Sequence, residues 1–425
     1  IVNGNVYGGG KYGKTKGNVE INVIDSKIGK FFGGGQGDAS NNVTSNIEGN
    51  VILNIDEKSI INEVYGGGDT ISTITGSVEI VSNGTTKDIY GGGYGGKTNV
   101  NGTISIKSNE NAVVNGSIYG GGEQGVTYDT NIEITGSKIN GSIYGAGNNA
   151  GSQTTNVKIS DTASIIGNIY GGSNASGTTT TSNVNIEGTV ANNVYAGGKG
   201  SGTTVTTANL NINIGADIKG NAFGGAEEGA VGASNIKLNG GKANNVFGGS
   251  DKASISGAVN IESSAGSFVK NIYGGCNSSG AINSLSMNLA GKADNVFMGG
   301  NATPTESKDI TGEAKIDVIT SEANSIGNIY GGSNSTGSVT SPIINISGYV
   351  TNVYGGGKGS STTTNTPSVT IKSGGHVTGS VYGGGEEGIT HGTTVTLDDG
   401  SIVNDAFAGG NKVGVDGTVA INAST

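Results

Sequence analysis

The feature that most constrains how this chain can fold is one short phrase that recurs along its whole length. The phrase is an aliphatic residue, an aromatic residue and then two or three small residues, and it reads Asn-Val-Tyr-Gly-Gly-Gly both at 5–10 and at 352–357. We call its aromatic residue the anchor. The 16 anchors are Tyr7, Phe32, Tyr65, Tyr90, Tyr119, Tyr144, Tyr170, Tyr195, Phe223, Phe247, Tyr273, Phe297, Tyr330, Tyr354, Tyr382 and Phe407. A chain built on one repeated phrase is expected to fold as a stack of similar units, each packed on its neighbours.

The spacing of the anchors sets the size of the unit at about 25–27 residues. Of the fifteen intervals, thirteen are 24 to 29 residues long, and the two that follow Phe32 and Phe297 are both 33. The 83 glycines in 425 residues would by number alone suggest a disordered chain. Because they recur at the same place in each unit, they indicate a repeated bend instead.

A second element follows each anchor at a nearly fixed distance and alternates apolar with polar residues. Examples are Val-Glu-Ile at 19–21, Ile-Glu-Ile at 132–134 and Val-Thr-Ile at 369–371. This period of two is the signal of a half-buried strand. A third, weaker aliphatic position precedes the next anchor, as at Ile139 and Val377. The two long intervals carry their extra residues in the same connection, around 36–50 and 301–315.

These elements predict an all-β chain that folds as a parallel β-helix, or β-solenoid, of about 16 turns. Parallel stacking brings the aliphatic residues of successive turns into ladders, which together form a continuous core that one unit could not form alone. Asn-Gly pairs such as the one at 83–84 suggest stacked antiparallel hairpins as a rival. We favour the solenoid because the elements recur in the same order at the same offset. We expect one continuous solenoid over 1–425, as a segment of a longer array.

The position four residues after each anchor tests this stacking. In this column Lys199 is followed one turn later by Glu227, and Lys358 by Glu386, so each pair would form an ion pair between turns. The asparagines of the same column would bond amide to amide along the stack.

Composition excludes several classes of partner. The chain carries 23 basic and 33 acidic residues, a net charge of −10, and every basic residue is Lys. An acidic chain without Arg is a poor match for nucleic acid. The sequence contains no run of about 18 apolar residues, the length that a membrane-spanning helix needs. Membrane insertion is therefore not expected. The first residues do not read as an export signal.

The sequence offers few groups for catalysis, and we predict no catalytic residue, cofactor or metal site. Cys276 takes the place of a small residue in the stack, and His376 and His391 lie several turns away from it. The adjacent carboxylates Glu386 and Glu387 are better explained as solvated loop charge than as a glycosidase pair. The run Gly-Gly-Gln-Gly-Asp at 34–38 is one residue short of the calcium-binding nonapeptide pattern and does not repeat. Thr clusters such as 178–181 are too irregular for an ice-binding face.

The direction in which the anchor rings point has the most weight for function. Rings that point inward or lie at a corner would stack over the neighbouring glycines as a structural spine. Rings that point outward would form an exposed stripe, which would be a ligand platform, plausibly for sugars. We favour the spine because five of the 16 anchors are Phe, which a platform that needs the hydroxyl would not tolerate.

In architecture the chain resembles the β-solenoid stalks of secreted bacterial surface proteins and adhesins, which are long, Gly/Asn/Ser/Thr-rich and nearly free of Cys and Trp. The resemblance covers all 425 residues and rests on the repeated aliphatic-aromatic-Gly-Gly phrase. It implies a non-enzymatic structural or adhesive role outside the cell or on its surface, as a rigid rod that presents a binding surface. The partners this role allows are a cell-surface glycan or protein, or another copy of the chain, side by side or end to end.

The alternative is a carbohydrate-binding or carbohydrate-active β-helix of the polysaccharide lyase or glycoside hydrolase kind. Insertions in solenoids gather on one face and often carry binding sites. On this alternative we expect the site at the inserted connections 36–50 and 301–315.

Overall fold

The structure is a computed structural model and describes residues 1–302 and 308–424. It is all-β, with 56% of residues in strands, and forms a parallel β-solenoid of about 16 turns, as the sequence predicts. The short 3₁₀ segment η1 (Glu322–Asn324) is its only helix over these residues. In the same part of the chain, no helix is long and apolar enough to cross a membrane.

The chain divides into two compact units. Unit 1 comprises Ile1–Asn209, Gly215–Lys219 and Glu228–Ala230, and unit 2 comprises Leu210–Ile214, Gly220–Glu227 and Val231–Thr425. Strands β25 (Gly202–Asn213), β26 (Asp217–Phe223) and β27 (Ala230–Asn239) have residues in both. That all turns form one continuous solenoid stays a prediction.

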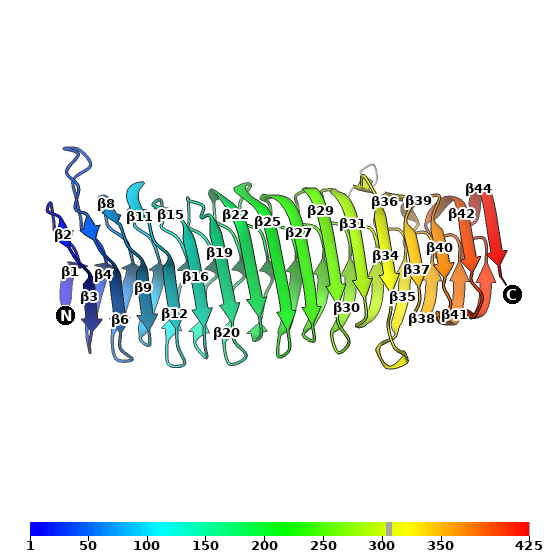
Figure 1. Cartoon of the computed structure of the whole chain (residues 1–425), viewed down its shortest axis with the longest axis horizontal. Helices are drawn as coiled ribbons and strands as arrows, with labels where there is room; N and C mark the ends of the chain where they lie inside the picture. Colours follow the sequence, from blue (N-terminus) through cyan, green and yellow to red (C-terminus); the bar gives the residue numbers. More distant parts are fainter. Residues whose placement is uncertain (303–307, 425) are drawn as a thin grey trace. The chain divides into compact units, whose positions relative to one another are not determined.

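In unit 1 the strands fall into three parallel sheets (Figure 1). The anchor sheet contains the strands that lead to each anchor: β1 (Val2–Tyr7), β4 (Lys27–Phe32), β7 (Ile60–Tyr65), β10 (Thr85–Tyr90), β13 (Val113–Val114), β14 (Ile118–Tyr119), β17 (Lys138–Ile139), β18 (Ile143–Tyr144), β20 (Ser164–Ile165), β21 (Ile169–Tyr170), β23 (Thr189–Val190) and β24 (Val194–Tyr195). The second sheet contains the alternating elements: β3 (Val19–Val23), β6 (Val51–Ile55), β9 (Val78–Ser82), β12 (Ile104–Ser108), β16 (Asp129–Ile134), β19 (Thr154–Ile159) and β22 (Ser176–Ile186). The third sheet is short: β2 (Thr15–Lys16), β5 (Ile47–Glu48), β8 (Ile71–Ile74), β11 (Lys97–Val100) and β15 (Val126–Thr127).

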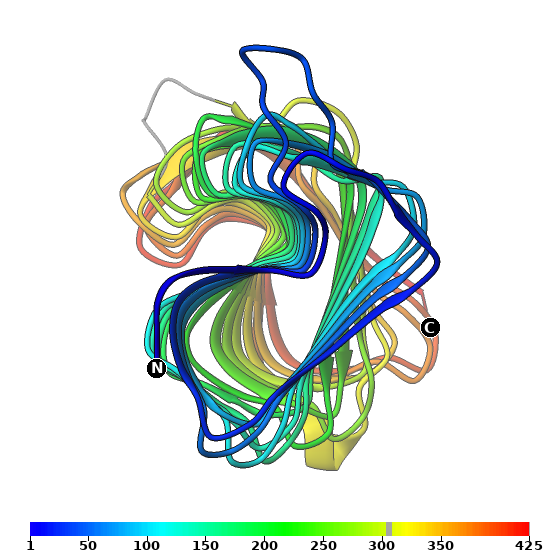
Figure 2. The same cartoon turned by 90° about the vertical axis from the view of Figure 1, so that its left-hand side faces the viewer.

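Unit 2 repeats this plan without a separate third sheet. Its anchor strands are β28 (Lys242–Phe247), β30 (Phe268–Tyr273), β32 (Lys292–Phe297), β35 (Ile326–Tyr330), β38 (Tyr349–Tyr354), β41 (His376–Tyr382) and β43 (Ile402–Phe407). Its remaining strands are β29 (Ile255–Ser263), β31 (Ile282–Leu289), β33 (Lys308–Ile310), β34 (Ala314–Val318), β36 (Thr336–Thr340), β37 (Ile343–Ile346), β39 (Ser361–Asn365), β40 (Ser368–Ile371), β42 (Ile389–Leu397) and β44 (Val415–Ala423). Within each unit, successive turns follow closely similar paths (Figure 2).

The core of each unit is made of aliphatic ladders that cross the turns. In unit 1 the second sheet pairs Leu53 with Ile80, Ile106 and Ile132 in turn, and all four side chains are buried. Ile139 and Val377, from the weaker aliphatic position, are also buried in their units. The strand pairings within each unit are parallel, which excludes the stack of hairpins. Burial of one such side chain contributes about 1.5–3 kcal/mol, so a thin core gains its stability by repetition.

Candidate functional site

The anchors stack ring on ring within each unit. Neighbouring ring centroids lie 4.5 to 5.1 Å apart and the ring planes differ by at most 12°. Most rings are buried: Tyr65 and Phe297 are each 1% exposed, whereas Phe407 is 47% exposed. We call each stack an anchor ladder. Because each ring is covered by the rings before and after it, the ladder does not form an exposed stripe along the turns.

The anchor rings lie on the face of their sheet that points away from the aliphatic core. In β7, Val64 is completely buried, and a Cβ built on Gly66 would lie only 2.6 Å from the side chain of Val78 in the second sheet. Val64 and Gly66 therefore face the core, and Tyr65 between them faces the other way. The ladder is a second buried layer beside the core, so the rings neither point into the core nor form an exposed stripe along the turns. At Gly66 a larger residue would collide with this side chain of the second sheet, although other turns accommodate Ala196 or Met298 directly after the anchor.

The hydroxyl groups of several anchors reach carboxylates in the column four residues after a later anchor. Tyr7 donates to Asp69 at 2.8 Å, and Tyr65 lies 3.0 Å from Glu123, in each case two turns further along. Tyr65 also lies 3.0 Å from Glu63, which pairs with Lys30 at 2.7 Å. Burial, reinforced by these carboxylates, raises the pKa of Tyr65 far above its usual range. Burial alone opposes ionisation of Glu63, but Lys30 and the tyrosine hydroxyl outweigh it and lower the pKa of that carboxyl.

We expected Glu386 to pair with Lys358, but in the structure its partners are Tyr330 and Lys412. Glu386 accepts hydrogen bonds from the Tyr330 hydroxyl at 2.9 Å and from Lys412 at 3.3 Å, and the adjacent Glu387 accepts from the same ammonium at 2.9 Å. In the described part of the chain, Lys358 makes no ion pair. It lines a cavity of about 400 Å³ together with Glu386 and Glu387.

The other expected ion pair would join Lys199 of unit 1 to Glu227 of unit 2, and it stays a prediction.

Amide ladders are a feature that the sequence predicts in part. In the column four residues after the anchor, Asn301 bonds to Asn277 at 2.9 Å and Asn334 bonds to Asn301 at 2.8 Å, as expected. A longer ladder two residues before the anchor was missed. Its five hydrogen bonds, 2.8 to 3.0 Å long, join Asn221, Asn245, Asn271, Asn295, Asn328 and Asn352 in unit 2. The signal for it was an Asn at the same offset in six successive turns.

The first inserted connection, 36–50, contains the projecting blue loop of Figure 2. Asp38 holds the loop together: its carboxylate accepts bonds from the backbone of Ser40 at 2.9 Å and from the side chain of Asn41 at 2.7 Å. The hydrogen bond from Asn41 lowers the pKa of Asp38. The carboxylate that a calcium ion would need therefore already closes the loop.

The second inserted connection, 301–315, includes residues 303–307, which lie outside the described residues. Past them, the buried carboxylate of Asp309 accepts bonds from the backbone N–H of Gly300 at 3.1 Å and from the hydroxyl of Ser333. Asp309 therefore satisfies groups inside unit 2 rather than facing solvent.

Cys276 is buried in the small-residue column, with its thiol 3.3 Å from the carbonyl oxygen of Ala253. Burial raises the pKa of this thiol to about 12, so it is not a ready nucleophile. His376 packs against the ring of Tyr349, and His391 lies near Asp416.

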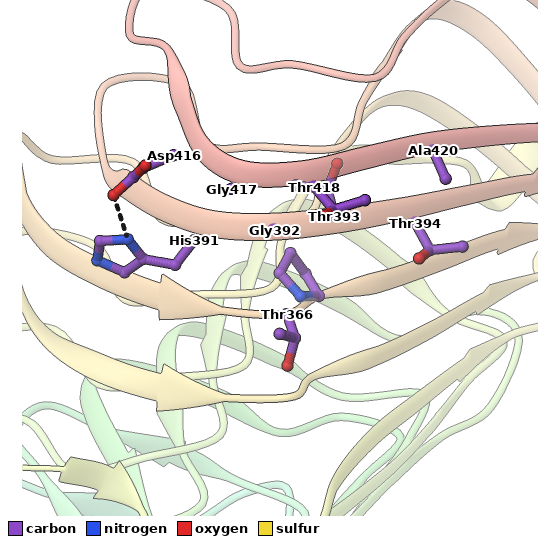
Figure 3. Close-up of a pocket in the computed structure, with 10 residues that line it drawn as sticks. Thr366, His391, Gly392, Thr393, Thr394, Asp416, Gly417, Thr418 and Ala420 are labelled. Atoms are coloured by element: carbon purple, nitrogen blue, oxygen red, sulfur yellow. Dashed lines mark ion pairs between the residues drawn. The ribbon is translucent and has the colours of Figure 1, made fainter.

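A furrow of about 540 Å³ lies between the last turns of unit 2 (Figure 3). The left-handed backbone of Thr366, Gly392 and Gly417 forms this furrow, with φ values of 45°, 67° and 99°. At its rim, His391 Nδ1 lies 3.6 Å from Asp416 Oδ2. The hydroxyl of Thr393 bonds to a backbone carbonyl oxygen. The Thr393 hydroxyl therefore fastens two neighbouring turns of unit 2 to each other.

Over residues 1–302 and 308–424, no group of three or more His, Cys, Asp or Glu side chains is placed to hold a metal ion. Comparison with known protein families, curated proteins and solved structures found no match.

Proposed function

We propose that this chain is a non-enzymatic repeat region of a secreted or surface-exposed bacterial protein, and that it acts as a stiff support that presents a binding surface. The observation that carries the proposal is the set of ladders that tie successive turns together within each unit. A rigid support needs every turn to be fastened to its neighbours, because its weakest junction determines where it bends.

The use of the polar side chains supports this proposal. The carboxylates of Glu63 and Glu386 hold tyrosine hydroxyls and lysines in place, and the asparagines hydrogen-bond one another. Groups used in this way stabilise the stack and are not poised for proton transfer to a substrate.

Cell fractionation and surface labelling test the location. Antibody raised against the chain should label intact producing cells or their culture medium. Labelling that appears only after the cells are made permeable would contradict the proposal.

The alternative, a carbohydrate-active β-helix, makes a different prediction. Its carboxylate candidates are Asp38, in the first inserted connection, and Glu386, so cleavage of a polysaccharide should be lost in Asp38→Asn or Glu386→Gln. The second variant also tests the pair that Glu386 forms with Glu387. We expect no release of reducing ends or unsaturated products from a panel of neutral and acidic polysaccharides. Turnover by the wild-type chain that either variant abolishes would overturn the non-enzymatic role.

A further inference from the structure

A pocket of about 550 Å³ in unit 1 is formed by three successive turns and lies apart from the anchor ladder. We call it the Tyr128 pocket. Its exposed side chains include Gln124, Val126, Tyr128, Asn149, Gln153 and Thr178. They lie in or near β15 and in the turns of β16, β19 and β22, which pair in this order in the second sheet (Figure 1).

Strand register brings these residues together. Asp129 pairs with Thr154, and Thr154 pairs with Thr181, so Tyr128 lies beside Gln153 in the next turn. The backbone N–H of Gln153 donates to the carbonyl oxygen of Tyr128 at 2.6 Å. Because alternate residues of a strand point to the same side, Gln124, Val126 and Tyr128 all face outward.

Gly151 lies in the lining of the pocket and contributes no side chain to it. The bond between the hydroxyls of Thr127 and Ser152, 2.8 Å long, places Val126 beside Gly151. A Cβ on Gly151 would collide with the backbone of Thr178, so glycine is required there. Gly151 thus lets the next turn, which carries Thr178, pack directly against this wall of the pocket.

The pocket exposes apolar surface that the fold otherwise buries. Tyr128 is 51% exposed and Val126 is 52% exposed, whereas the anchor Tyr144 of the same turns is 4% exposed. An accessible aromatic ring with an aliphatic neighbour offers a surface for the C–H face of a ligand.

The amides of the pocket differ from the other amides of these turns. Asn131, Asn156 and Asn183 hydrogen-bond one another along the second sheet at 2.8 and 2.9 Å. By contrast, the side chains of Gln124 and Gln153 make no hydrogen bond to any residue in the described part of the chain. Each amide offers both donors and an acceptor, which is what a hydroxyl group needs.

The pocket has no charged side chain in its lining, although the chain has a net charge of −10. A charged ligand would find no counter-charge there, so the lining favours a neutral ligand.

We propose that the Tyr128 pocket binds a neutral glycan, with one sugar ring lying on Tyr128 and its hydroxyls bonded by Gln124, Asn149 and Gln153. A volume of about 550 Å³ is in the range of small-ligand sites. The inference deepens the proposed supporting role, on which it rests, by naming the class of ligand that the surface presents.

The test is calorimetric titration of the full chain with neutral oligosaccharides, namely maltopentaose, cellopentaose and N-acetylchitopentaose, and with an acidic oligogalacturonate. At least one neutral probe should bind. Tyr128→Ala should weaken that binding at least about tenfold and Gln153→Ala several-fold, because each removes direct contacts.

Tyr12→Ala is the matched control, because Tyr12 also lies in unit 1 and is also 51% exposed. It should leave affinity unchanged, and circular dichroism should show that all variants are folded. Failure of every neutral probe to bind, binding of the acidic probe alone, or equal weakening by Tyr128→Ala and Tyr12→Ala would each overturn the inference. None of these outcomes changes the surface-labelling result, so failure of the glycan site and failure of the supporting role are distinguishable.

Discussion

The hydroxyl of Tyr330 donates a hydrogen bond to the carboxylate of Glu386, two turns further along unit 2, across 2.9 Å. Tyr7 with Asp69 and Tyr65 with Glu123 repeat this relationship in unit 1. Each bond skips the intervening turn, so it ties three turns together rather than two. The anchor column and the column four residues later therefore form one hydrogen-bonded network that links the turns.

We expect this bond to stabilise unit 2 measurably. Glu386→Ala removes the acceptor of a largely buried hydroxyl and should lower the free energy of unfolding by about 1–2 kcal/mol. Glu387→Ala is the control, since Glu387 bonds Lys412 but not the tyrosine. Denaturant unfolding of both variants, and of Tyr330→Phe with and without Glu386→Ala, measures the coupling of the two side chains. Additive effects in this cycle would mean that the bond contributes nothing.

The repeat unit, the parallel stacking and the register could be predicted from the sequence because each depends on spacing. Tyr65, for example, aligns with Tyr90 in the structure as their common phrase implies. The buried aliphatic residue before the next anchor, such as Ile139, follows from the same periodicity.

Contacts that depend on how a side chain leans could not be predicted. Counting places Lys358 one turn before Glu386, but it does not reveal that Lys412, one turn after, reaches the same carboxylate. The burial of the anchor rings could not be predicted either. The alternation of residues along a strand shows which side a ring faces, but it does not show that a ring facing away from the core is buried by other rings. The Tyr128 pocket depends on the register of three turns, which brings Tyr128 and Gln153 together.

The amide ladder of unit 2 should be sensitive to a break at its centre. Asn271 donates to Asn245 and accepts from Asn295, both at 2.9 Å, so Asn271→Ala leaves a part-buried donor and acceptor without partners. We expect a loss of about 1–3 kcal/mol in the free energy of unfolding. Asn404→Ala, at an exposed asparagine of the same unit, should have little effect. Equal stability of the two variants would show that the hydrogen bonds of the ladder do not stabilise unit 2.

The anchor ladder should depend on the ring more than on the hydroxyl. Tyr170→Ala removes a buried ring stacked on Tyr144 and Tyr195, at 5.0 Å on each side, and should cost about 3–5 kcal/mol. Tyr170→Phe keeps the ring and removes the hydroxyl, which accepts a hydrogen bond from Asn168, and should cost less than Tyr170→Ala. Thermal and denaturant unfolding compare the two. If Tyr170→Phe were as destabilising as Tyr170→Ala, the hydroxyl rather than the ring would hold the ladder.

Cys276 should be unreactive until unit 2 unfolds. Its raised pKa and complete burial keep the thiol protonated and inaccessible, so a thiol reagent at pH 8 should modify it only in denaturant. Cys276→Ser should keep stability nearly unchanged, because Ser173 makes the equivalent bond to a carbonyl oxygen in unit 1. Rapid modification of the folded chain would contradict the burial of this thiol.

Alkaline pH should unfold the chain through its anchors. Burial raises the pKa of Tyr119 and Tyr273 to about 12 and that of Tyr65 and Tyr330 further, from a usual value near 10. A folded state that holds these protons more tightly than the unfolded state has its full stability below pH 10 and loses it as the pH rises toward 12. Circular dichroism against pH should therefore show cooperative unfolding above pH 10. Absorbance at 295 nm should report ionisation of the anchors at the same midpoint. Tyr119→Phe should shift that midpoint to higher pH, and a midpoint that stays in place would mean that this tyrosine does not drive the transition.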